Sequence, residues 1–190
     1  MLNKEELPKR RGTKYLGRNG NLWAVRDMVI SKDGVVKDPE LVYVPSEIGF
    51  DRRVSYPITN DKDDVINIKN KIIPLLLRLN KMEVILPILG WFFATPFTPL
   101  IREQLGHFPI LSLWGTHGAG KSSLLRLLWE LFGVKSELFS STETAFTFLR
   151  LFSGSSSIPI IIDEFKPYTM LDREVTLLIR YLKRIYDGGY

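Results

Sequence analysis

The sequence contains no cysteine and only two histidines among its 190 residues. The absence of cysteine excludes disulfides and thiolate metal sites, and two histidines make a histidine-based metal cluster a poor expectation. Apolar and charged residues are well represented, at 45% and 25% of the chain, so the protein can bury a globular core. These features fit a reducing compartment, and we expect a cytoplasmic protein.

Positive charge is in modest excess, and much of it lies near the start of the chain. The formal net charge is +5. A basic arm over residues 1–11 can contact nucleic-acid phosphates, but a solvated, frayed terminus explains the same charges. No apolar segment follows these charges, which argues against a secretory signal. The basic residues of the first twenty positions are Lys4, Lys9, Arg10, Arg11, Lys14 and Arg18.

One long run, VILPILGWFFATPFTPLI at residues 84–101, carries no charge and just reaches the length of a membrane-spanning helix. Three prolines interrupt it and two threonines dilute it. We therefore predict a buried helix over residues 82–94, then a proline-bounded turn, and no membrane partner. A membrane role remains the alternative.

The first third of the chain is predicted to form a small antiparallel β module over residues 12–58. The dipeptides Asn19-Gly20 and Asp33-Gly34 tolerate the positive backbone angles of hairpin turns, and short β-leaning runs surround them. The run RVSYPI could add another strand. The aromatic residues of the β module could stack on nucleic-acid bases, although a place in the hydrophobic core is the better expectation. They are Trp23, Tyr43, Phe50 and Tyr56.

Residues 59–107 are predicted to form a helical lead-in. After the capping residues 59–61, apolar side chains recur at helical spacing as far as Leu79, and Asn80 is a plausible end. Pro74 should kink this first helix or split it in two.

The stretch WGTHGAGKSSLL contains G-x-x-x-x-G-K-[ST] from Gly115 to Ser122. The apolar run at residues 108–114 has the length of a strand, and leucines at helical spacing follow the motif as far as Gly133. The predicted order is therefore strand, glycine loop and helix, which is the context that a phosphate-binding loop requires.

Each residue type in this loop suits the binding of a nucleotide triphosphate. Glycines let successive N–H groups converge on phosphate oxygens, and the following helix adds its positive end. Lys121 can reach the β- and γ-phosphates, and the Ser122 hydroxyl can ligate Mg²⁺. His117 is better explained as a solvent-facing residue, and Ser123 as an ordinary first-turn residue. The predicted nucleotide-binding set is Gly115, Thr116, His117, Gly118, Ala119, Gly120, Lys121, Ser122 and Ser123.

A second motif follows the apolar run IPIII, which suits a buried strand and ends in Asp163-Glu164. We predict that Asp163 holds Mg²⁺ with Ser122, and that Glu164 acts as general base for an attacking water, with Lys121 as the other catalytic residue. The alternative is that Asp163-Glu164 merely caps the next helix.

The chain between the two motifs has room for an additional strand. We expect a strand over residues 137–140, a helix over residues 143–152 and then a polar loop, with Ser140 and Glu143 compatible with a capping box. The predicted fold class is therefore α/β, a three-layer phosphate-loop NTPase core of the additional-strand class over residues 108–190.

Residues 82–190 resemble the ATPase core of AAA+-type and superfamily-3-like helicases, especially the primase–helicases of phages, plasmids and other mobile elements. The resemblance rests on FPILSLWGTHGAGKSSLLRLL and IPIIIDEFKP, which are similar to the Walker A and Walker B motifs. It implies ATP and Mg²⁺ as ligands, DNA as a partner and a ring-shaped homo-oligomer. Such cores usually continue with a sensor strand and an arginine finger. Arg173, Arg180 and Arg184 lack that context, so we assign no finger and expect a core that is incomplete at its C-terminal end.

The expected function is ATP hydrolysis in a helicase-like or translocase-like motor that acts in DNA replication of a mobile element. One alternative is a nucleotide-binding regulatory switch whose β module binds a protein. A nucleotide or small-molecule kinase is a further alternative, although adjacent Asp and Glu residues favour hydrolysis.

Overall fold

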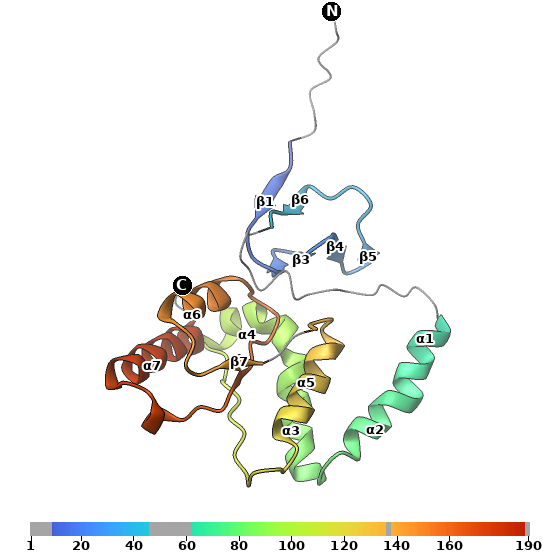
Figure 1. Ribbon diagram of the computed structural model, residues 1–190. Helices are drawn as coiled ribbons and strands as arrows, with labels where there is room; N and C mark the ends of the chain where they lie inside the picture. Colours follow the sequence, from blue (N-terminus) through green and yellow to red (C-terminus); the bar gives the residue numbers. More distant parts are fainter. Residues whose placement is uncertain (1–8, 46–61, 136–137, 189–190) are drawn as a thin grey trace, which may run out of the picture.

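Short strands near the N-terminus form two small sheets in the computed structural model, which describes residues 9–45, 62–135 and 138–188 (Figure 1). Strands β2 (Gly17–Asn19), β3 (Leu22–Val25), β4 (Met28–Ser31) and β5 (Gly34–Val35) form an antiparallel meander in chain order. An antiparallel sheet is therefore present within the predicted module, over residues 17–35. A separate pair, β1 (Arg11–Thr13) and β6 (Leu41–Tyr43), is parallel and was not expected.

The hairpin turns lie near the predicted dipeptides but are offset from them. Asn19 pairs with Leu22, so Gly20 begins the first turn, and its φ of +63° explains the glycine. Ser31 pairs with Gly34, which places Gly34 after the turn rather than inside it. A further turn between β3 and β4 divides a run that looked continuous in the sequence. The possible strand at residues 53–58 lies outside the described residues.

Helices make up the lead-in, and the first of them runs through Pro74. It consists of α1 (Lys62–Asn67), a π-helical turn (Ile68–Ile72) and α2 (Ile73–Leu77). Pro74 lies at the start of α2 inside this continuous helix, and the π-helical turn directly before it changes the hydrogen-bond register where proline supplies no N–H. The predicted disruption at Pro74 therefore takes the form of a π-helical turn.

The second helix, α3 (Met82–Ala94), has the predicted bounds. The predicted proline-bounded turn after it is a 3₁₀ turn (Thr95–Phe97), which leads straight into α4 (Thr98–Leu105). Pro96 and Pro99 each lie in the first turn of one of these elements. At such positions the backbone N–H, which proline lacks, has no acceptor within the element. The helical stretch Met82–Leu105 is long and apolar enough to cross a membrane. The core helix of a soluble protein can have the same length and composition, so this is weak evidence for a membrane span.

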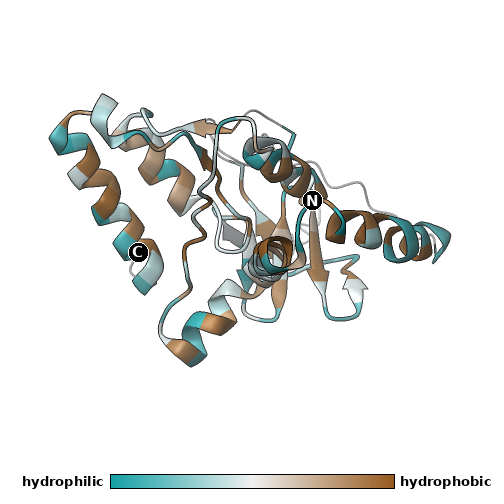
Figure 2. Cartoon of the chain, turned by 90° about the horizontal axis from the view of Figure 1, so that it is seen from below, coloured by the Kyte–Doolittle hydropathy of each residue, from teal (hydrophilic) through white to brown (hydrophobic). Residues whose placement is uncertain are grey.

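The C-terminal half alternates helices with two short strands. Helix α5 (Lys121–Leu131) is followed by β7 (Phe139–Ser140), α6 (Ala145–Ser153), β8 (Ile162–Asp163) and α7 (Asp172–Asp187). Strands β7 and β8 are parallel neighbours. In Figure 2, hydrophobic and hydrophilic residues are interleaved along the helices, as expected for helices with one buried face.

Helix α6 begins at a different cap from the one predicted. Thr144 precedes the helix, and its Oγ1 accepts a hydrogen bond from the backbone N–H of Thr147 at 3.2 Å. The predicted capping box of Ser140 and Glu143 is therefore wrong, because the helix starts later in the chain.

The predicted strand at residues 108–114 is not a strand in the described part of the chain. Leu111 and Leu113 pack against the apolar cluster of α3 and α5, whereas Ile110 is exposed and Trp114 is 93% exposed. This alternation is typical of an extended segment with one buried face. Within the described ranges, however, no strand is hydrogen-bonded to it. Apolar composition predicts burial, but only a neighbour completes a β-ladder.

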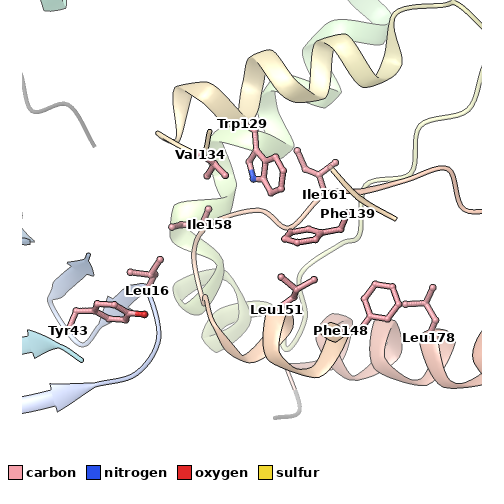
Figure 3. Close-up of a cluster of buried hydrophobic side chains, with 10 residues drawn as sticks. All are labelled: Leu16, Tyr43, Trp129, Val134, Phe139, Phe148, Leu151, Ile158, Ile161 and Leu178. Carbon is pink, nitrogen blue, oxygen red and sulfur yellow. The ribbon is translucent and has the colours of Figure 1, made fainter. Parts of the chain in front are cut away.

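The main core joins the C-terminal elements to the β module. Figure 3 shows Trp129 of α5 facing Phe139 of β7 and Ile161, with Leu151 of α6 and Leu178 of α7 on the other side. The same cluster includes two residues of the N-terminal region, Leu16 and Tyr43. The β module therefore contributes to the core that supports the two sequence motifs.

Candidate nucleotide-binding site

The loop from Gly115 to Gly120 is exposed and turns sharply before α5 begins. Gly118 and Gly120 have φ values of +77° and +79°, in the left-handed region that glycine adopts without a steric penalty. Open space surrounds the position that a Cβ would take on either residue. The glycines are therefore required by backbone conformation, and the loop leaves free volume beside the start of a helix.

The Lys121 ammonium lies over this loop. Its Nζ donates to the carbonyl oxygen of Gly115 at 2.9 Å and to that of Thr116 at 2.7 Å. Both acceptors are exposed main-chain groups. The lysine therefore spans the loop from end to end, and its partners are ones that an anionic ligand could replace.

The second motif lies against the start of α5. The Ser122 hydroxyl donates to Asp163 Oδ1 at 3.0 Å, which joins two residues 41 positions apart in the chain. Asp163 is held there by β8, in which it pairs with Ser140 of β7. The structure thus places a serine hydroxyl and a carboxylate, both partly buried, beside the N-terminus of α5.

Glu164 turns away from Asp163. It has a φ of +54°, and it is the one non-glycine residue with a positive φ among those described. Its carboxylate is exposed and accepts a hydrogen bond from Lys166 Nζ at 2.7 Å. The left-handed conformation costs a side-chain-bearing residue about 1 to 2 kcal/mol, so surrounding contacts must hold it.

Lys166 also sets the electrostatics of Glu164. Its hydrogen bond, and then its positive charge, lower the pKa of the Glu164 carboxyl, while His117 adds a smaller effect in the same direction. The carboxylate in turn raises the pKa of Lys166, mainly through the same hydrogen bond. Glu164 is therefore held in its charged form, which is the form that a proton acceptor needs.

Two residues of this region were missed in the sequence. Lys166 follows Glu164 by only two positions, and a single lysine in an exposed turn gives no signal that it pairs with the acid. The buried Ser141 donates its hydroxyl to the carbonyl oxygen of Glu164 at 2.8 Å. Since Ser141 lies 23 residues before Glu164, only the pairing of β7 with β8 reveals this contact.

The oxygen ligands available at this site, Ser122 and Asp163, suit a magnesium ion rather than a metal ion whose ligands all come from the protein. Among the described residues, no group of three or more His, Asp or Glu side chains could hold a metal ion. Magnesium is commonly bound by one or two protein oxygens, with phosphate and water oxygens completing its shell. Ser122 and Asp163, whose oxygens lie 3.0 Å apart, would supply that protein share.

The structure brings four of the predicted site residues together. Lys121, Ser122 and Asp163 converge at the start of α5, and Glu164 lies beside Asp163 with its side chain directed to Lys166. His117 and Ser123 are exposed, and the positions of Thr116 and Ala119 matter through their backbone. Two hollows of the described surface are lined by other residues, one between α4 and the C-terminal end of α7 and one between α6 and the start of α7.

The chain matches no protein-family model, no curated protein and no solved structure.

Proposed function

We propose that the chain binds ATP with Mg²⁺ at the Gly115–Ser122 loop and hydrolyses it, as a phosphate-loop NTPase. The observation that carries this proposal is the 3.0 Å contact between Ser122 and Asp163. The two residues lie 41 positions apart in the chain, and a phosphate-loop ATPase needs the serine of the first motif beside the aspartate of the second. A chance glycine turn before a helix would not require this contact.

Each side chain then has a distinct role. The Lys121 ammonium exchanges its two carbonyl partners for β- and γ-phosphate oxygens. Ser122 and Asp163 would hold Mg²⁺, which when bound supplies positive charge to the same phosphates. Glu164 accepts a proton from the attacking water. To reach that water, its carboxylate must give up the hydrogen bond from Lys166.

We further propose that hydrolysis drives movement on DNA, within a ring-shaped homo-oligomer that serves replication of a mobile element. The support is the resemblance of residues 82–190 to helicase cores and the excess of basic residues near the N-terminus. We place this activity in the cytoplasm.

A nucleotide-dependent regulatory switch is the second candidate, and one contact favours it. Leu16 of the β module exchanges backbone hydrogen bonds with Gly154 and Ser156, both 2.9 Å long. These residues directly precede the run that ends in Asp163. A protein bound to the β module could therefore bias the nucleotide site through this connection.

Paired variants of adjacent serines test nucleotide binding. Binding of a non-hydrolysable ATP analogue is measured by calorimetry with and without Mg²⁺, for wild type, Ser122→Ala and Ser123→Ala. We expect the Mg²⁺-dependent gain in affinity to disappear in Ser122→Ala and to persist in Ser123→Ala, since Ser123 is exposed. Equal behaviour of the two variants would contradict the proposal.

Turnover then separates the two candidate functions. Single-stranded DNA should stimulate ATP hydrolysis if the protein is a motor. A switch should hydrolyse ATP slowly, with no response to DNA.

A further inference from the structure

Ser141 lies where β7 and β8 end, and its side chain reaches the second motif. It directly follows β7, and it is only 2% exposed. Its Oγ donates to the Glu164 carbonyl oxygen at 2.8 Å. The residue before it, Ser140, pairs with Asp163, so Ser141 is next to the point at which the chain leaves the sheet.

Two hydrogen bonds fix the backbone around Glu164. Asp163 Oδ1 accepts one from the Glu164 N–H at 3.1 Å, and Ser141 donates the other to the Glu164 carbonyl. They therefore restrain the peptide groups on both sides of a residue with a φ of +54°. Such a conformation persists only where surrounding contacts hold it.

This backbone conformation separates the two carboxylates. Asp163 Oδ1 faces Ser122, whereas the Glu164 side chain faces Lys166. If Glu164 relaxed to a negative φ by a flip of the Asp163–Glu164 peptide, its N–H would turn away from Asp163 Oδ1. Asp163 Oδ1 would then lose one of the two donors that orient it, the other being Ser122.

We propose that Ser141 is a positioning residue for the Asp163–Glu164 pair, which orients the metal-binding carboxylate and the general base through the Glu164 carbonyl. The inference rests on the proposed function, and it adds a residue that belongs to neither sequence motif. It assigns Ser141 no contact with nucleotide or metal.

A merely structural role is the competing explanation, since any buried hydroxyl needs a partner. Ser157 provides the matched control, because it is 3% exposed and its Oγ accepts a hydrogen bond from the Arg18 N–H at 3.1 Å. It joins the β module to residues 155–157, away from the two carboxylates. Loss of either hydroxyl should lower thermal stability, but only Ser141 should affect the metal site.

The experiment compares wild type, Ser141→Ala and Ser157→Ala by calorimetry with AMP-PNP as the probe. The readout is the ratio of Kd without Mg²⁺ to Kd with Mg²⁺. We expect Ser141→Ala to reduce this ratio about five- to tenfold, the effect of one lost hydrogen bond. Its Mg²⁺-free Kd should stay within about twofold of wild type. Ser157→Ala should keep the wild-type ratio.

The outcomes separate the inference from the proposed function. If wild type binds AMP-PNP with a Mg²⁺-dependent gain that Ser141→Ala retains in full, the positioning role is overturned and the proposed function stands. If wild type does not bind AMP-PNP, the proposed function fails and the inference falls with it. If Ser141→Ala does not fold, Ser141→Cys replaces it. The thiol is a weaker donor of similar size, and an unchanged ratio in that variant overturns the role.

Discussion

Replacement of Lys121 by alanine should weaken nucleotide binding strongly and destabilise the free protein very little. In the free protein the ammonium has two partners, the carbonyl oxygens of Gly115 and Thr116, at 2.9 and 2.7 Å. Both are exposed, so water can replace the lysine, and we expect a stability loss below about 1 kcal/mol. Hydrogen bonds to charged groups contribute about 1.5 to 3 kcal/mol, which corresponds to roughly 10- to 150-fold weaker binding of ATP.

The assay is calorimetric titration with AMP-PNP and Mg²⁺, together with thermal unfolding of each protein. Arg126→Ala is the matched control, because Arg126 is an exposed cation on the same helix as Lys121. It should keep wild-type affinity. The reasoning is refuted if Lys121→Ala binds as tightly as wild type, or if both variants lose affinity equally. In the second case, only the general positive charge of α5 would matter.

Three further predictions concern the second motif and the core. Glu164→Gln should retain nucleotide affinity and lose hydrolysis, since it removes only the proton acceptor; a turnover rate near wild type would exclude Glu164 as the base. Lys166→Met should raise the pKa of Glu164 toward its ordinary value, so the acid limb of the kcat/KM profile should move to higher pH. Coincident profiles would show that Lys166 does not act on the reacting carboxylate. Trp129→Phe should lower the free energy of unfolding by about 1 to 3 kcal/mol, because the buried Pro159 carbonyl loses the indole donor at 2.8 Å. Chemical denaturation measures this change, and an unaltered midpoint would contradict it.

Features fixed by local chemistry could be predicted from the sequence. The bounds of α3 follow from the apolar run and the prolines around it, and they agree with the structure. The convergence of Ser122 and Asp163 could also be anticipated, because a motif fixes which side chains must meet.

Apart from the contact of Ser122 with Asp163, features that depend on partners distant in sequence could not be predicted. Nothing in residues 108–114 reveals whether a neighbouring strand is available to them. The parallel pair of β1 and β6 likewise requires a chain reversal through the meander. Ser141 looks like any serine in a polar run until β7 and β8 align. In each case the deciding partner lies many residues away along the chain.

The attachment of Leu16 has a consequence for the order in which the protein can fold. Leu16 is fully buried, yet its backbone partners are Gly154 and Ser156, and its neighbour Arg18 bonds to Ser157, 139 positions further along the chain. At a synthesis rate of about 5 to 20 residues per second, roughly 7 to 28 s pass before those partners leave the ribosome. Throughout this interval Leu16 lacks these partners, although β2 can already pair with β3. The anchoring of the β module to residues 154–157 is therefore among the last steps of folding, and until then Leu16 adds exposed apolar surface of the kind that favours aggregation or capture by a chaperone.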